Sequence, residues 1–330
     1  MRMWYLRAAR LALVAGLAVV VSGCSYIDMF QAQLAFRDAN RAYASGNYEE
    51  AAGFYGEVLA DNPDVAAAYF FLANSLDQQF RPARRGEADN DALLEEAIAN
   101  YRLAAEHPLQ TPELRQLSLE YLVAAYGPDK MNDPAQAEPI VLRMIELDTG
   151  NEANYFVLAQ IYEDAGAYDL AADALVQARQ ARPDSADVYM RLAGFYSRQG
   201  DFPAVVEALE ARVAQEPQNP EAYHTLSQYY WDEVFSNFRL SDDQRMDYVL
   251  AGIAASDQAI GLNQNYAEAL IFKNLLLRRQ ALLVDDFGEA QELIAEADAL
   301  LQRAEELQEI QRGAGGPGPQ ASAGEPGPAE

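Results

Sequence analysis

The chain has 330 residues, with 24 Lys and Arg against 51 Asp and Glu, a formal net charge of −27, one Cys and two His. Its length suits one large or two ordinary domains, and a content of 50% apolar residues can bury a sizeable core. A single Cys excludes a disulfide framework and a cysteine-based metal cluster. The acidic excess argues against a nucleic-acid partner, because phosphates are bound by Lys and Arg.

The first segment has the organisation of a secretory signal peptide. A basic stretch over residues 1–10 is followed by an apolar run from Leu11 to Val21. As a helix this run would be about 16 Å long, whereas the hydrocarbon core of a bilayer is roughly 30 Å thick. We therefore interpret residues 1–23 as a signal peptide rather than a membrane span.

The residues that follow the apolar run are Val21-Ser22-Gly23-Cys24, and they resemble the lipobox of bacterial lipoproteins. The resemblance implies cleavage before Cys24 and attachment of diacylglycerol to its thiol, with residues 24–31 as a lipidated tether. In that family a Ser at the next position, here Ser25, implies an outer-membrane location facing the periplasm of a Gram-negative cell. The alternative is that Cys24 merely ends an ordinary signal peptide.

A period of 34 residues organises the chain that follows. In the clearest copies, aromatic, Leu, Gly and Pro positions recur in register. The recurring positions are Tyr155, Tyr189 and Tyr223; Leu158, Leu192 and Leu226; Tyr162, Tyr196 and Tyr230; Gly166 and Gly200; and Pro183 and Pro217. This pattern resembles the tetratricopeptide-repeat (TPR) family, whose unit is a pair of antiparallel helices. The resemblance implies an all-α fold, a right-handed α-solenoid of about seven helix–turn–helix units over residues 32–312, with a C-terminal capping helix.

Individual positions within the repeat have physical roles. The small side chain of Ala159 lets the first helix of its repeat lie close to the second, so that a larger residue would overpack the contact, whereas Ala174 is expected to be exposed. Gly166 and Gly200 can adopt positive φ and thereby end the first helix of each repeat. We assign none of these residues to chemistry.

Three segments depart from the period. The residues from Gln79 to Leu94 include three Arg, Pro and Gly and are interpreted as a surface loop, in which the Arg side chains neutralise nearby acids. Between Tyr230 and Val249 both helices of a repeat are expected to be extended, because apolar residues continue the first helix and Ser241 begins a capping box for the second. Residues 313–330 are rich in Gly, Pro and Ala and are expected to be disordered.

The TPR resemblance also implies a groove lined by the first helix of each repeat. Such a groove could hold an extended or helical peptide, and the alternative for each aromatic residue is packing against neighbouring helices. The implied lining residues are Phe70, Asn74, Phe156, Gln160, Glu163, Met190, Arg198, His224, Gln228 and Trp231.

The sequence contains no pattern typical of catalysis. His107 and His224 lie in different repeats without a partner at metal-ligand spacing, and no G-x-S-x-G or H-E-x-x-H motif occurs. We predict no enzyme, no cofactor and no metal. The predicted function is that of an outer-membrane-anchored interaction scaffold in secretion, pilus, outer-membrane or peptidoglycan machinery; the alternative is an enzyme or enzyme activator of cell-wall metabolism.

Overall fold

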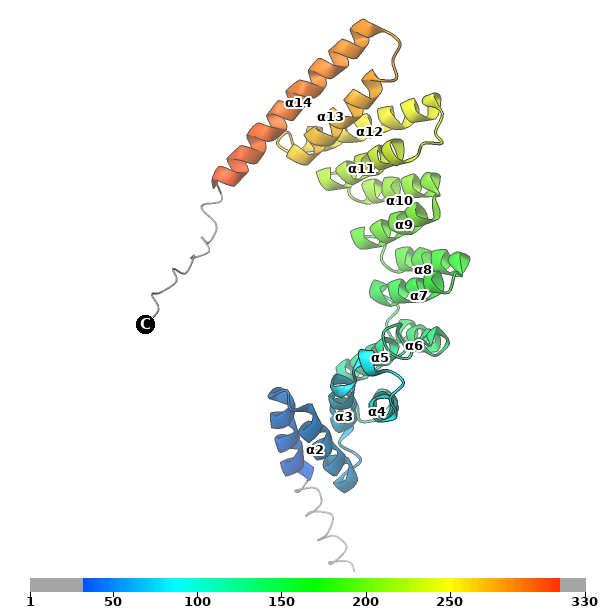
Figure 1. Cartoon of the computed structure of the whole chain (residues 1–330), viewed down its shortest axis with the longest axis vertical. Helices are drawn as coiled ribbons and strands as arrows, with labels where there is room; N and C mark the ends of the chain where they lie inside the picture. The colour runs from blue at the N-terminus through cyan, green and yellow to red at the C-terminus, as the bar shows by residue number, and fades with distance from the viewer. Residues whose placement is uncertain (1–31, 315–330) are drawn as a thin grey trace, which may run out of the picture. The chain divides into compact units, whose positions relative to one another are not determined.

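The computed structural model describes residues 32–314, and this part of the chain is helical without a strand (Figure 1). The predicted signal peptide, Cys24, the tether and the tail from residue 315 lie outside the described residues. Seven consecutive helix pairs make up the described part. They are the helix over residues 32–44 with α2 (Tyr48–Asp61); α3 (Ala66–Gln79) with α4 (Ala88–Glu106); α5 (Pro112–Ala125) with α6 (Pro134–Leu147); α7 (Glu152–Asp164) with α8 (Tyr168–Ala181); α9 (Ala186–Gln199) with α10 (Phe202–Gln215); α11 (Pro220–Ser236) with α12 (Asp242–Leu262); and α13 (Ala267–Ala281) with α14 (Phe287–Ala314).

The predicted fold class, an all-α solenoid of helix–turn–helix repeats, is confirmed. Neighbouring pairs pack through adjacent helices, for example α2 on α3 and α4 on α5. The expected C-terminal capping helix is α14, which closes the series of helix pairs. It is also the long second helix of the seventh pair and packs along α13.

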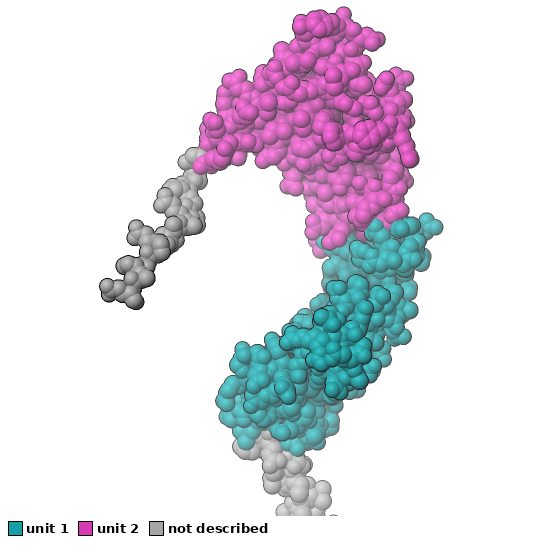
Figure 2. Space-filling view, in the orientation of Figure 1, with its two compact units in different colours: residues 1–174 teal, residues 175–330 magenta. Residues whose placement is uncertain are grey.

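The chain divides into two compact units, residues 1–174 and 175–330, with the boundary inside α8 (Figure 2). The core of the first unit is rich in aromatic rings, among which Tyr55 stacks on Phe71 with ring centroids 5.7 Å apart and Tyr101 stacks on Tyr121 at 5.4 Å. The second unit contains a cluster around Val234, Val249 and Leu276 and another where α13 packs on α14.

Glycine ends the first helix of the clearest repeats, as the sequence predicts. Gly166 and Gly200 adopt φ angles of 73° and 72°, a backbone conformation that costs glycine little because it has no Cβ. After α9 the N–H of Gly200 donates to the carbonyl of Ser197 at 3.1 Å, and the N–H of Asp201 donates to that of Tyr196 at 3.0 Å. These bonds satisfy carbonyls at the helix end while the chain reverses.

The sixth helix pair is longer than the fifth, again as predicted. Its helices α11 and α12 have 17 and 21 residues, whereas α9 and α10 have 14 each. The capping box at the start of α12 is complete, because the Gln244 N–H donates to Ser241 Oγ at 3.2 Å and the Ser241 N–H donates to Gln244 Oε1 at 3.1 Å. The extra turns therefore project this hairpin beyond the standard repeat length.

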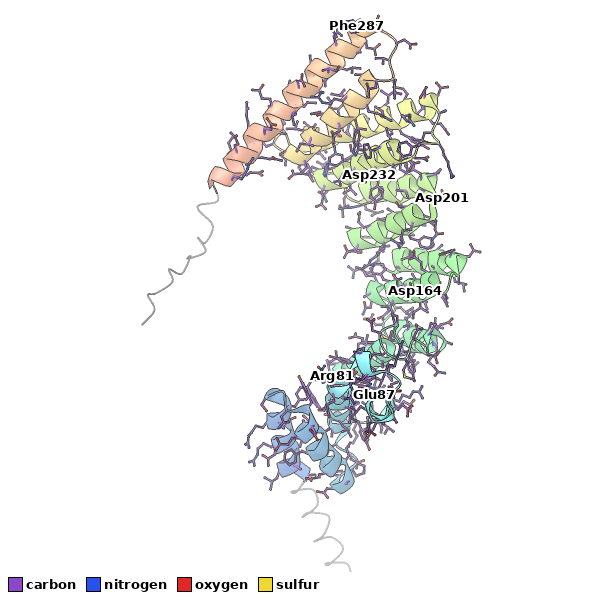
Figure 3. All side chains as sticks on the ribbon, viewed as in Figure 1. Arg81, Glu87, Asp164, Asp201, Asp232 and Phe287 are labelled. Carbon is purple, nitrogen blue, oxygen red and sulfur yellow. The ribbon has the colours of Figure 1, made fainter. Side chains whose placement is uncertain are left out.

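The predicted loop between α3 and α4 is shorter than expected. α4 begins at Ala88, so half of the segment interpreted as loop is helical. The side chain of Asn90 accepts the Arg81 N–H at 2.8 Å and donates to the Arg81 carbonyl at 3.2 Å, which closes the loop. Arg84 pairs with Glu87 at 2.5 Å, so this Arg neutralises a neighbouring acid (Figure 3 labels Arg81 and Glu87).

Candidate functional site

Two of the predicted groove residues in the first unit, Phe70 and Asn74, are buried and pack against neighbouring helices, and a role for them in binding a partner stays a prediction. Phe70 is buried, with its ring 5.9 Å from that of Tyr101 and 5.7 Å, edge to face, from that of Tyr121. Asn74 is also buried, accepts a hydrogen bond from Tyr43 Oη at 2.7 Å and donates to Tyr101 Oη at 3.2 Å. Both positions of α3 are covered because α4 and α5 place aromatic rings against this helix.

A buried polar network continues from Asn74 along α3. Tyr101 Oη donates to Asp77 Oδ2 at 3.4 Å, and Lys130 Nζ, from the loop between α5 and α6, donates to Asp77 Oδ1. Burial is the main cause that raises the pKa of Tyr101, and the neighbouring Asp77 adds to it. The network joins the first three helix pairs, and we interpret it as structural because its members satisfy one another.

The other three predicted groove residues of this unit lie on α7 with the spacing of one helical face. Phe156 and Glu163 are half-buried, while Gln160 is exposed and donates to Asp164 Oδ1 at 2.7 Å. The positions are open enough for a partner to contact, and their role in binding stays a prediction.

In the second unit, α9 contributes Met190 and Arg198. Met190 is half-buried, and its sulfur accepts a hydrogen bond from Nη1 of the buried Arg212 at 3.3 Å. Arg198 lies two turns further along the helix and is exposed. Contact of a partner with either residue stays a prediction.

His224 on α11 is buried, and its predicted place in a groove stays a prediction. Its ring packs against Tyr266 and Phe272, with centroid distances of 5.0 and 5.2 Å. Nδ1 has no hydrogen-bond partner among the described residues. Burial lowers the pKa of His224, against the opposing effect of Glu268 and Glu221. The imidazole is therefore favoured in its neutral form, as an aromatic filler of the core.

Further along α11, Gln228 is half-buried, and its contact with a partner stays a prediction. Trp231 is half-buried too. It packs against the cluster around Val234 and stacks on Phe235, with ring centroids 5.5 Å apart. Trp231 therefore contributes to the packing of the extended hairpin, and packing against neighbouring helices is the alternative that the sequence left open for it.

Exposed apolar side chains gather at the tips of the last two hairpins. The exposed fractions are 64% for Phe235, 88% for Phe238, 75% for Leu282 and 75% for Phe287, which Figure 3 labels at the start of α14. The two tips are joined through the cluster around Val234, against which Leu283 packs. We call Phe235, Phe238, Leu282 and Phe287 the hairpin-tip surface. Leu282 and Phe287 belong to the degenerate seventh repeat, whose pattern includes Phe287 but predicts no exposed surface for either residue.

Acidic side chains accompany the hairpin-tip surface. They are Asp232, Asp242, Asp243, Asp285 and Asp286, and all are exposed. Arg239 is an exposed base in the same hairpin. Apolar groups beside carboxylates match a partner that combines apolar and basic side chains.

The described residues show neither a membrane-spanning element nor a metal site. Within residues 32–314, no helix combines the length and apolar character needed to cross a bilayer. In the same span no three His, Cys, Asp or Glu side chains are placed to hold a metal ion.

Comparison with known proteins gives one family match. A tetratricopeptide-repeat family profile matches residues 163–229, and no curated protein matches the chain. The crystal structure of MamA is 20% identical with a TM-score of 0.38, over 56% of this chain and 93% of that one. YrrB, described as a TPR protein with an unusual peptide-binding site, is 19% identical with a TM-score of 0.37, over 58% and 89%. The C-terminal part of a TPR protein from Cytophaga hutchinsonii is 13% identical with a TM-score of 0.49, over 83% and 98%.

Proposed function

We propose, because this chain is a tetratricopeptide-repeat protein, that it acts as an adaptor in assembly of the cell envelope. Stacked helix pairs of this kind form a protein–protein interaction scaffold, in which each repeat adds surface without adding chemistry. The proposed partner is a protein of the secretion, pilus, outer-membrane or peptidoglycan machinery. The observation that carries the proposal is the hairpin-tip surface, whose four large apolar side chains are each 64% or more exposed. A group of exposed apolar side chains is typical of a protein–protein interaction site.

The proposed location is the periplasmic face of the outer membrane, where a lipid on Cys24 holds the chain. The support is the basic and apolar start of the sequence followed by the small residues before Cys24. A lipid anchor also suits the acidic chain, because a net charge of −27 gives no attraction to anionic headgroups.

The anchor is tested by Cys24→Ser, which removes the thiol to which the lipid would attach. We expect the wild-type protein to fractionate with membranes and to resist extraction by high salt, and the variant to move to the soluble fraction. The measurement is an immunoblot of separated envelope and soluble fractions. If the variant stays with the outer membrane after a salt wash, the lipid on Cys24 is not the anchor.

The adaptor function is tested by capture of partners from detergent-solubilised envelopes. We expect a partner bound by wild-type protein to be retained at least about tenfold less by the double variant Phe235→Ser/Phe238→Ser, because aromatic side chains supply much of the binding energy at interfaces. Quantitative mass spectrometry of the eluates measures the ratio.

The matched control is Leu103→Ser/Leu109→Ser, which removes two exposed apolar side chains from the first unit. This control is expected to retain the partner as wild type does. Both double variants should be fully folded at the temperature of the capture, as measured by circular dichroism, although Phe235→Ser removes the stack on Trp231. Equal loss of the partner in both variants, or no loss in either, would count against the hairpin-tip surface as the binding site.

A further inference from the structure

The first unit contains a cavity of about 570 Å³ between α4, α5 and α6. It lies between the second helices of two successive repeats, α4 and α6, with α5 between them. The groove expected from the sequence is lined by first helices, so this cavity is a different site. Its size is in the range of pockets that hold a ligand or a peptide side chain.

The floor of the cavity is apolar. Leu119 and Leu122 of α5 are buried beneath it, and α6 adds the half-buried Ile140 and, at its C-terminal end, the exposed Leu147. These side chains leave room for a bulky aliphatic or aromatic group, whose burial there would be favourable.

Three arginines surround this floor, each from a different helix: Arg102 of α4, Arg115 of α5 and Arg143 of α6. Glu106 is the one acidic residue in the lining. Basic residues thus outnumber acidic ones in the lining, whereas the whole chain has 51 acidic and 24 basic residues. The lining therefore concentrates positive charge on an otherwise acidic protein.

Two of the guanidinium groups are held in place by hydrogen bonds. Arg102 Nη2 donates to Tyr126 Oη at 2.6 Å and to Gln136 Oε1 at 3.2 Å. Arg115 donates to two carbonyls near the end of α4, those of Ala105 and His107. In each group these bonds leave Nε uncommitted, and a fixed guanidinium loses little further freedom when it binds a carboxylate.

Arg143 is held more loosely. It pairs with Glu146 at 2.8 Å, one turn away on the same helix, and both side chains are more than half exposed. An exposed pair of this kind contributes little to stability. Arg143 can therefore exchange Glu146 for a carboxylate of a ligand at small cost.

We propose that this cavity binds an acidic amphipathic segment of a protein partner, with an apolar side chain on the floor and carboxylates on the three arginines. The basic lining selects acidic residues, and the apolar floor selects a peptide over a small inorganic anion. The proposal does not rest on the adaptor function or on the hairpin-tip surface, whose expected partner is basic.

The test measures fluorescence anisotropy of short labelled peptides with the purified full chain. One peptide alternates leucine with glutamate, a second alternates leucine with lysine, and a third alternates glycine with glutamate. We expect saturable binding of the first peptide alone. Arg143→Gln should weaken that binding roughly tenfold, because a lost hydrogen bond between charged groups has an effect of this size.

Arg182→Gln is the matched control, since Arg182 forms a similar exposed pair with Asp184, at 3.2 Å, in the second unit. Both variants make the same change in net charge and should unfold at the wild-type temperature. The control is expected to bind the first peptide as wild type does. Equal weakening by both variants, equal binding of the leucine–lysine peptide, or no saturable binding at all would overturn the proposal.

Discussion

Replacement of Lys130 by Met is expected to lower the free energy of unfolding by about 3 kcal/mol. Its ammonium group contacts the carboxylate of Asp77, whose side chain is only 4% exposed. The substitution would leave that carboxylate buried without its cation, with Tyr101 Oη as its remaining donor at 3.4 Å. Denaturant unfolding monitored by circular dichroism measures the change.

A double variant separates the loss of the pair from the cost of the unpaired charge. Asp77→Asn combined with Lys130→Met removes both charges, and we expect it to recover most of the stability lost in Lys130→Met alone. A loss below about 1 kcal/mol in the single variant is what an exposed ion pair gives. That result would contradict a structural role for the Asp77–Lys130 contact.

Replacement of Ala159 by Leu is expected to cost about 1–3 kcal/mol of stability through overpacking. Ala159 is 4% exposed on α7, which packs against α6, and the larger side chain would force the helices apart. The same denaturation experiment measures the loss.

The control for this substitution comes from the structure. The sequence places Ala174 on an exposed face, but its side chain is 1% exposed, so this prediction is wrong and Ala174→Leu would overpack as well. Ala99 is exposed within α4 and is the appropriate control. Ala99→Leu should change stability by less than about 0.5 kcal/mol; similar losses at Ala99 and Ala159 would be incompatible with close packing at Ala159.

Features determined by neighbouring residues could be read from the sequence alone. The 34-residue period predicts the helix pairs, Gly166 and Gly200 predict the turns through their freedom to adopt positive φ, and Ser241 with Gln244 predicts the start of α12. Each depends on interactions within one repeat or one helix end, where spacing along the chain sets spacing in space. The fold class followed from these local features.

The burial of the predicted groove positions was decided by the tertiary structure. Phe70, Phe156, Met190 and His224 occupy the same position of the second, fourth, fifth and sixth repeats, one residue after the recurring aromatic. Phe70 and His224 are buried, because Tyr121 covers the first and Tyr266 with Phe272 covers the second, whereas Phe156 and Met190 are half-buried. The repeat register sets the direction of a side chain, but residues of other helices decide whether anything covers it.

The same reason explains why the sequence did not reveal the arginine-lined cavity. Arg102, Arg115 and Arg143 belong to no motif, and they come from three helices separated along the chain by turns of different length. Packing of α4, α5 and α6 brings the three side chains around one apolar floor. The sequence by itself determined the helix pairs and their turns, and only the packing between pairs decided which surfaces stay open and which charges share them.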